Sequence, residues 1–387
     1  MRATAADRRP LLVALACGLV AVVAALAACF AAQNGTFDPS ALVKMSRDEP
    51  LAAVARGLDP GFAFVNPVEH YDGVYYYAMA LDPFLRGTAH TLIDQAAYRY
   101  GHPMYGWLGG AAVLGSDRAA PWGLFAVTLL AAAVAGFAVS RLAAGYGRTP
   151  WAGLVVAMSP GLLYAGTVST TEWLGIALLT VALLLWERRA LLPLAATLIA
   201  LCLTKEQFVT VPAGIGLWLV VERLRRGRAI PRPVATLGAL AAGPAALTAW
   251  YLYVRAQLGA FPANYEPGNL GAPGTGWLEA FRQSAALSAG SFDQSQIGAI
   301  TPPVLVAVAV LVLVASAAAV RVRTPLDAIL LGWAAITACM GWLTLTYPHE
   351  LVRTPATVVL LALGALLLGP GRGAALAQDV AREPSTS

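Results

Sequence analysis

The sequence predicts an all-α polytopic membrane protein with about ten transmembrane helices, and three observations support this fold class. Hydrophobic residues make up 58% of the 387 residues and charged residues only 12%, whereas soluble domains carry about 25% charged residues. Apolar runs long enough to span a bilayer recur along the chain. Arginines gather in the short loops between alternate runs, as the positive-inside rule expects of cytoplasmic segments.

The first predicted helix covers residues 10–32 and begins after the pair Arg8 and Arg9. Its apolar run of about 20 residues has the length of a full span and exceeds the core of a usual signal peptide. We therefore expect an uncleaved helix with a cytoplasmic N-terminus. Two alternatives remain, because the same pattern resembles a signal peptide and residues 26–29 resemble a lipoprotein cleavage box ending at Cys29.

Residues 33–103 form a long polar loop that we place outside the membrane. Residues 40–58 carry mixed charge and modest amphipathicity, which favours a helix lying on the membrane surface. Residues 75–85 start with three tyrosines, a residue type enriched at the membrane interface, so a second interfacial helix is predicted there.

Residues 104–254 form the predicted helical core. Residues 104–114 are apolar but too short to cross a bilayer, and a half-helix or re-entrant segment fits them better. Further crossings are expected over residues 121–144, 150–168, 173–186, 191–203, 208–221 and 234–254.

A second polar loop, residues 255–301, precedes the C-terminal helices of residues 302–369. Crossings are expected there over residues 302–320, 325–346 and 354–368, and residues 370–387 are expected to be a disordered tail. The aromatic residues of the second loop and its border either stack on sugars or anchor the chain at the interface: Tyr253, Tyr265, Trp277 and Phe281.

The chain is thus predicted to be one integral membrane domain, residues 1–387, with both termini in the cytoplasm. The formal charge of +5 comes from arginines in loops between apolar runs, so it does not indicate nucleic-acid binding. The four cysteines all lie in apolar stretches without CxxC spacing, which argues against disulfides and zinc sites.

Polar residues concentrate in residues 65–103, which hold three of the four histidines and six tyrosines. The predicted topology brings further ionisable residues from distant helix ends to the same outer face. We expect several of these side chains to contact a substrate: Tyr71, Tyr76, His102, Glu172, Glu206 and His349. For a single charge the alternative is an interfacial residue that extends to water.

Asp72 is the strongest catalytic candidate. Gly73 permits a tight backbone turn beside it, and neighbouring aromatic residues favour a partly desolvated carboxylate with raised proton affinity, suited to a general base. The alternative is an N-cap of the tyrosine-rich helix. Asp82 and Asp94 are better explained as caps or turn residues.

Three cations, Arg99, Lys205 and Arg353, are suited to binding a phosphate group at this face. A carboxylate base together with fixed cations is what transfer from a phosphate-linked donor to a hydroxyl requires. We expect no cofactor. A divalent metal on Glu69 and His70 is the alternative, although the histidine spacings match no standard ligand pattern.

Residues 10–222 resemble the GT-C superfamily of membrane glycosyltransferases, and residues 223–387 resemble it only in architecture. The resemblance rests on short motifs in this order: Tyr71-Asp72-Gly73, Tyr76-Tyr77, Asp82-Pro83-Phe84, Ala97-Tyr98-Arg99-Tyr100, Pro103, Thr171-Glu172 and Leu203-Thr204-Lys205-Glu206. A GT-C-like fold is accordingly expected.

By resemblance, such an enzyme moves a sugar from a polyprenyl-phosphate donor to an envelope acceptor, with inversion. The acceptor is a glycan, a lipid or a protein, and the reaction occurs at the outer face of the cytoplasmic membrane. Asp72 maps onto the general base of the family and Glu69 onto a second acid in a Glu-x-x-Asp pattern. Position 74 is valine, so a strict Asp-x-Asp is absent.

Two other function classes compete with a glycosyltransferase. A transporter or flippase for a lipid-linked or small solute would carry polar groups near the membrane midplane and often internal repeats. The polar clusters here lie at helix ends, and we find no repeat. A non-catalytic envelope assembly protein would tolerate the combined loss of Asp72, Glu172 and Lys205.

Overall fold

The computed structural model describes residues 5–227, 229–262, 269–287 and 292–368. Within these ranges the chain is helical, and its only β pairings are two isolated bridges, Ser46 with Val65 and Leu270 with Met340. The predicted all-α class is therefore confirmed. The predicted tail, residues 370–387, and Tyr265 lie outside the described residues.

The α-helices are, in chain order, α1 Ala5–Ala32, α2 Pro50–Leu58, α3 Gly73–Leu81, α4 Ala96–Arg99, α5 Met104–Ala112, α6 Ala120–Gly145, α7 Leu154–Ala157, α8 Pro160–Thr167, α9 Glu172–Glu187, α10 Leu191–Thr204, α11 Thr210–Arg226, α12 Pro233–Leu258, α13 Thr275–Leu287, α14 Phe292–Ala319, α15 Pro325–Ala338, α16 Pro348–Arg353 and α17 Ala356–Leu368. Short 3-10 turns join them: η1 Pro39–Val43, η2 Pro67–Glu69, η3 Ala89–Leu92, η4 Asp117–Ala119, η5 Pro150–Gly153, η6 Glu206–Val209 and η7 Trp342–Thr344.

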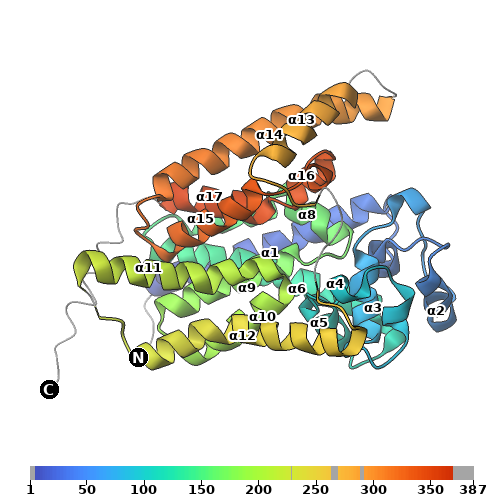
Figure 1. Cartoon of the computed structure of the whole chain (residues 1–387), viewed down its shortest axis with the longest axis horizontal. Helices are drawn as coiled ribbons and strands as arrows, with labels where there is room; N and C mark the ends of the chain where they lie inside the picture. Colours follow the sequence, from blue (N-terminus) through green and yellow to red (C-terminus); the bar gives the residue numbers. More distant parts are fainter. Residues whose placement is uncertain (1–4, 228, 263–268, 288–291, 369–387) are drawn as a thin grey trace.

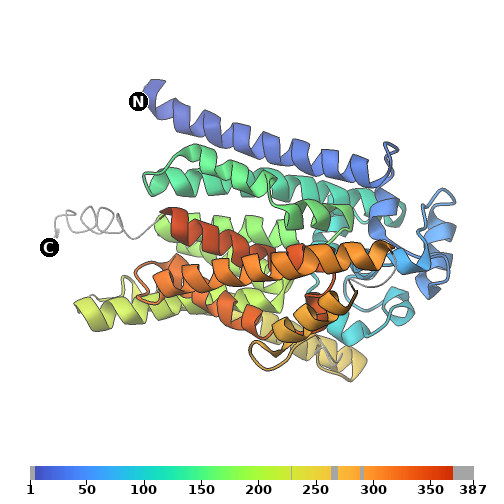
Figure 2. The same cartoon turned by 90° about the horizontal axis from the view of Figure 1, so that it is seen from above.

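The long helices lie side by side along one axis, and the short helices α2 to α5 gather at one end of this bundle (Figure 1 and Figure 2). The start of α1 and the end of α17 lie at the opposite end. The sides of the membrane that these two ends face stay a prediction.

Six of the described helical segments are long and apolar enough to cross a membrane: Arg9–Ala32, Asp117–Gly145, Glu206–Arg226, Pro233–Leu258, Gly298–Ala319 and Pro348–Leu367. The chain is therefore a multi-pass membrane protein. The apolar helices α10 and α15 have only 14 residues each, and α9 has 16. The count of about ten crossings stays a prediction, since it requires α9, α10, α15 and the 150–168 segment to cross as well.

The crossing expected over residues 150–168 is not one helix. It is divided into η5, α7 and α8, with the break at Ser159 and Pro160. Proline lacks the backbone N–H and disfavours a helical conformation in the preceding residue, so a helix ends there. The Ser159 hydroxyl then caps α8 by accepting a hydrogen bond from the Leu162 N–H at 3.5 Å.

The 33–103 segment is a packed layer rather than an open loop. The tyrosine-rich helix α3 spans Gly73–Leu81 rather than residues 75–85 and is buried, with Tyr75, Tyr76 and Tyr77 each at most 6% exposed. Its position at the membrane interface stays a prediction. Close approach explains the burial, because a Cβ at Gly106 of α5 would lie 2.5 Å from the Met79 Cβ of α3. The surface helix expected over residues 40–58 is shorter and consists of η1 and α2.

The second polar segment is also more helical than expected, because α12 continues to Leu258, and α13 and the start of α14 lie within the segment. Two of its aromatic residues make internal contacts. Tyr253 donates a hydrogen bond to the Phe84 carbonyl at 2.6 Å, and the Trp277 Nε1 donates to the Thr337 carbonyl at 2.8 Å. The C-terminal end of α12 is thereby attached to the 33–103 layer.

Candidate functional site

Asp72 lies directly before α3, at the end of the bundle where the short helices gather. It occupies the N-cap position, but its side chain makes no capping hydrogen bond. Its carboxylate instead contacts two guanidinium groups, with Oδ1 3.4 Å from Arg99 Nη1 and Oδ2 3.3 Å from Arg353 Nη1. The capping alternative therefore does not account for this aspartate.

Gly73 places Asp72 by allowing a close approach of three backbone segments. A Cβ at this position would lie 2.6 Å from the Val43 carbonyl oxygen and 2.8 Å from the Val168 carbonyl oxygen. Backbone atoms cannot move aside as a flexible side chain would. Gly73 is thus required by packing, rather than by the tight turn that its sequence position suggested.

The two guanidinium groups determine the protonation of Asp72. Burial acts to raise the pKa of its carboxyl, but the positive charges of Arg353, Arg99 and Lys205 outweigh burial and hold that pKa below its usual value. The expectation of a raised proton affinity is therefore wrong for the protein without substrate. Asp72 is a carboxylate with one third of its side chain exposed, at 34%.

Glu172 at the first turn of α9 is a second acid in the same cluster. Its Oε1 lies 3.1 Å from Arg353 Nη1 and 3.7 Å from Lys205 Nζ, and its side chain is 6% exposed. The N-terminus of a helix favours a negative charge. Among the described residues, its Oε2 is buried without a hydrogen-bond partner.

Arg353, at the end of α16, joins the acids of the cluster. Besides Asp72 and Glu172, it binds Glu350 through Nη2 at 2.8 Å, and Glu350 also accepts a hydrogen bond from the Thr354 hydroxyl at 3.1 Å. Its guanidinium lies 4.9 Å from the centre of the Tyr71 ring. A buried cation is tolerated only when it is paired in this way.

Arg99, from α4, closes the other side of Asp72. Its guanidinium carbon lies 3.7 Å from the centre of the Tyr75 ring, a cation–π contact, and its Nη2 lies 3.6 Å from Asp94 Oδ2. Asp94 thus belongs to the cluster and is not only a turn residue.

Asp82 has the structural role predicted for it, because its carboxylate accepts hydrogen bonds from the Arg86 and Gly87 N–H groups, both at 2.8 Å.

Two aromatic groups border the cluster. His102 is buried beside the Tyr76 ring, and its Nδ1 lies 3.6 Å from Glu206 Oε2. On the other side, the His349 ring lies 5.3 Å from that of Tyr164 and 6.3 Å from that of Tyr71, measured between ring centres. The predicted substrate-binding residues therefore all lie at this cluster or along its border.

Glu69 does not join the cluster. It is exposed, and its carboxylate makes no ion pair with any described residue. His70 is engaged by Glu49, whose Oε1 lies 2.6 Å from its Nδ1, and His90 is engaged by Asp82 at the same distance. In the part of the chain that the structure describes, no group of three or more metal-binding side chains converges.

Every predicted phosphate-binding cation already has a carboxylate neighbour. Arg99, Lys205 and Arg353 meet Asp72, Asp94, Glu172 and Glu350, so the cluster carries one more negative than positive group. Lys205 has the weakest engagement, with a single 3.7 Å contact and a side chain that is 23% exposed. To bind Arg99 or Arg353, an incoming phosphate must therefore displace a carboxylate. Lys205 can donate N–H groups to the phosphate without such a displacement.

Several buried polar atoms of the cluster and its border have no hydrogen-bond partner among the described residues: Tyr71 Oη, Arg99 Nε, Glu172 Oε2, Glu206 Oε2 and Arg353 Nε. Such atoms are costly in an apolar core and are usually satisfied by water or ligand. Their concentration around Asp72 indicates a site that receives polar groups.

Glu350 and Tyr164 belong to this site but were not among the predicted site residues, and Asp94 was predicted only as a cap or turn residue. Glu350 precedes Arg353 by three residues, a spacing that pairs side chains on one helix face and was available as a signal. Tyr164 had no such signal, because its position depends on the break before α8.

Comparison with protein-family models, with curated proteins and with solved structures finds no match for this chain.

Proposed function

We propose that the protein is a membrane glycosyltransferase of the GT-C type. In this proposal it moves a sugar from a polyprenyl-phosphate donor to a glycan, lipid or protein acceptor, at the outer face of the cytoplasmic membrane. One observation supports it most: Asp72, Glu172, Lys205 and Arg353 come from four separate parts of the chain and meet in one network of ion pairs.

Asp72 is the proposed general base. The acceptor hydroxyl attacks the anomeric carbon of the donor, its proton passes to Asp72, and the bond between that carbon and the phosphate oxygen breaks. The lowered pKa of Asp72 keeps the carboxylate deprotonated before substrate binds. As Arg353 and Lys205 turn to the phosphate, they compensate less of the charge on Asp72, and its affinity for a proton rises.

Lys205 and Arg353 are the proposed phosphate ligands. Charge accumulates on the departing phosphate as the sugar leaves, and fixed cations in a partly desolvated site stabilise that charge. Arg99 holds Asp72 from the other side, at 3.4 Å, and orients it toward the acceptor.

Replacement of the base tests this assignment. We expect Asp72→Asn to abolish transfer from a polyprenyl-phosphate sugar, with a loss of about 100-fold or more, while expression and melting temperature change little. Asp48→Asn is the matched control, because Asp48 is an exposed aspartate in the same outer layer. Transfer at the wild-type rate in the Asp72 variant would remove Asp72 from the reaction.

A transporter is the second candidate, and the division of residues 150–168 into η5, α7 and α8 favours it. Discontinuous helices beside charged groups are common at transport sites. Proteoliposomes distinguish the two functions: a transporter moves the lipid-linked sugar or solute across the bilayer with no change in its covalent structure, whereas the enzyme consumes the donor.

A further inference from the structure

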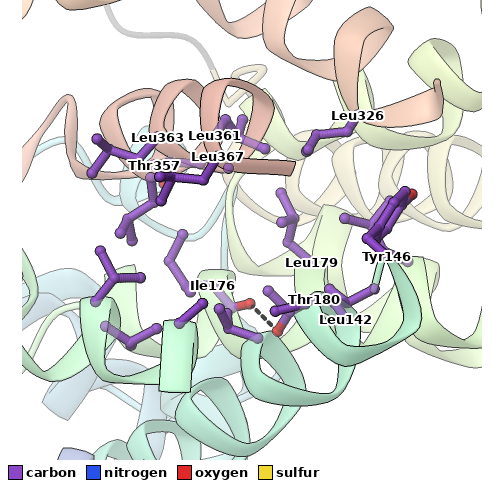
Figure 3. Close-up of a pocket in the computed structure, with 18 residues that line it drawn as sticks. Leu142, Tyr146, Ile176, Leu179, Thr180, Leu326, Thr357, Leu361, Leu363 and Leu367 are labelled. Atoms are coloured by element: carbon purple, nitrogen blue, oxygen red, sulfur yellow. Dashed lines mark hydrogen bonds between the residues drawn. The ribbon is translucent and has the colours of Figure 1, made fainter. Parts of the chain in front are cut away.

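The apolar pocket within the bundle is poorly suited to a sugar. It lies between α6, α9 and α17, and Figure 3 shows that leucines such as Leu142, Leu179 and Leu361 turn toward one another across it. The Thr180 hydroxyl is already satisfied, because it donates to the Ile176 carbonyl at 2.8 Å, the dashed line of Figure 3. A sugar placed there would leave its hydroxyl groups without partners. The sugars of the proposed reaction therefore bind elsewhere.

Four aromatic rings form a continuous series beside the charged cluster. The His349 ring stacks on Tyr347, with ring centres 5.8 Å apart and ring planes at 27°. It also lies 5.3 Å from the Tyr164 ring and 6.3 Å from the ring of Tyr71, the residue directly before Asp72. We call these four aromatic residues the aromatic arc. The arc leads from Asp72 to the surface, because Tyr347 and His349 are exposed whereas Tyr164 and Tyr71 are partly buried.

The backbone fixes the exposed end of the arc. Thr346 is buried, and its carbonyl accepts a hydrogen bond from the Thr301 hydroxyl of α14 at 2.8 Å. The Tyr347 carbonyl accepts a hydrogen bond from the Leu351 N–H of α16 at 2.9 Å. The Tyr347 ring stacks on His349 and is still 41% exposed. A ligand that packs on this ring therefore has little side-chain ordering to compensate for.

Unpaired polar atoms lie at the inner end of the arc. The Tyr71 hydroxyl, Arg353 Nε and Glu172 Oε2 are buried and make no hydrogen bond with any described residue. They lie close together, since the Arg353 guanidinium is 4.9 Å from the centre of the Tyr71 ring and 3.1 Å from Glu172 Oε1. Buried polar atoms are normally satisfied by water or a ligand. Arg353 can donate, Glu172 can accept and Tyr71 can do both, which suits a ligand with several hydroxyl groups.

A sugar ring uses both kinds of group. Its C–H faces pack on the flat face of an aromatic ring, and its hydroxyl groups donate and accept hydrogen bonds. A hydrocarbon chain would cover the rings but leave the polar atoms beside them unpaired. Anchoring at the membrane interface would account for Tyr347, which directly precedes the apolar segment Pro348–Leu367, but not for those polar atoms.

We propose that the aromatic arc binds the acceptor and that the acceptor is a glycan of at least two sugars. One sugar stacks on Tyr347, and the glycan continues along His349 to Tyr71, where a hydroxyl of its reacting sugar meets Asp72. That oxygen forms the bond to the anomeric carbon of the donor, its proton passes to Asp72, and the polyprenyl phosphate leaves. The identity of the ligand as the acceptor rests on the proposed function, whereas sugar binding at the arc does not.

Saturation-transfer NMR of the full-length protein in phosphatidylcholine nanodiscs tests sugar binding. The probes are tetrasaccharides of glucose, of mannose and of N-acetylglucosamine. We expect at least one probe to bind wild type and Tyr347→Phe with equal affinity. We expect Tyr347→Leu to bind it about ten-fold more weakly, a change of ~1.4 kcal/mol, because leucine lacks the flat ring. Failure of all three probes to bind wild type, or unchanged affinity in Tyr347→Leu, would overturn the inference.

Phe30→Leu is the matched control. The Phe30 ring is 43% exposed and stacks on the Phe37 ring at 5.0 Å, much as Tyr347 stacks on His349. Its replacement should leave the affinity for the probe unchanged, and an equal loss in both variants would contradict the proposal. His349→Leu removes the second exposed ring of the arc and gives the same test if Tyr347→Leu does not fold.

Complementation of a strain that lacks the protein separates this inference from the proposed function. Mass spectrometry identifies the envelope component that gains a sugar, and we expect a glycan whose modified fraction falls about ten-fold with Tyr347→Leu and not with Tyr347→Phe. If the probes bind as expected but no transfer depends on Asp72, the sugar site stands and the glycosyltransferase proposal fails. If Asp72 is required but the acceptor is a protein or a lipid without a sugar, the enzyme stands and this inference fails.

Discussion

Asp72 is held between two guanidinium groups, and this pairing accounts for its state before the reaction. A lone aspartate among tyrosines would take up a proton more readily, as its sequence neighbours suggested. Arg353 and Arg99, at 3.3 and 3.4 Å, reverse that direction. The sequence predicted the wrong electrostatics for this residue, because the arginines lie 27 and 281 positions away along the chain.

His70 shows how a second ionisable residue supports this position. Its hydrogen bond to Glu49 raises its pKa despite the opposing effect of burial, with Asp72 and Asp94 adding to the raise. Its Nε2 also lies 3.3 Å from the Tyr75 hydroxyl. The hydrogen bond between His70 and Glu49 attaches residues 67–71 to the segment before α2. His70 lies two residues before Asp72.

The raised pKa sets the sign of a pH effect on stability. A group with a raised folded-state pKa contributes its full stabilisation below its unfolded value, about 6.5 for histidine, and loses it as the pH rises through the folded pKa. We therefore expect the melting temperature of wild type to exceed that of His70→Gln at pH 6, and this difference in melting temperature to shrink toward pH 9. A difference that grows with pH in thermal melts would contradict the Glu49 pairing.

Among the elements, proline-directed helix breaks bring charged residues to the site. Pro160 starts α8 and Pro348 starts α16, so Tyr164 and Arg353 lie on short helices, with Tyr164 beside His349 and Arg353 beside Glu172. The sequence predicted the apolar runs of α6, α9, α10 and α12 closely, because their length and polarity are local properties. The burial of α3 depends on packing between distant segments, whereas the proline break before α8 and the spacing of Glu350 and Arg353 are local signals in the sequence.

The entry to α3 offers a direct test of this packing. We expect Gly73→Ala to lower the free energy of unfolding by roughly 1–3 kcal/mol, the usual cost of overpacking, and to reduce transfer by displacing Asp72. Thermal or detergent unfolding measures the first effect. The control is Gly57→Ala in α2, where a Cβ meets nothing within 4 Å and a small gain in stability is expected. Equal melting of Gly73→Ala and wild type would refute the close approach to Val43 and Val168.

For the whole molecule, the charged cluster and the arginine-rich loops lie at opposite ends of one bundle. The 33–103 layer covers one end, and the start of α1 and the end of α17 lie at the other (Figure 1 and Figure 2). Because Lys and Arg gather on the cytoplasmic side, the arginine-rich end with Arg188, Arg223 and Arg226 is expected to face the cytoplasm. The donor phosphate and the acceptor would then meet at the outer surface.

Cysteine accessibility in intact cells tests this orientation and the number of crossings together. In a Cys339→Ser background, we expect Glu69→Cys to react with a membrane-impermeant maleimide from outside, because Glu69 is exposed in the 33–103 layer, which is predicted to face outward. Arg188→Cys, in the exposed turn after α9, should react only after the membrane is permeabilised. Reaction of both from outside would mean that an even number of crossings separates residues 69 and 188, so that only one of the 150–168 segment and α9, with its 16 residues, crosses besides the long span Asp117–Gly145, and the predicted topology would be wrong.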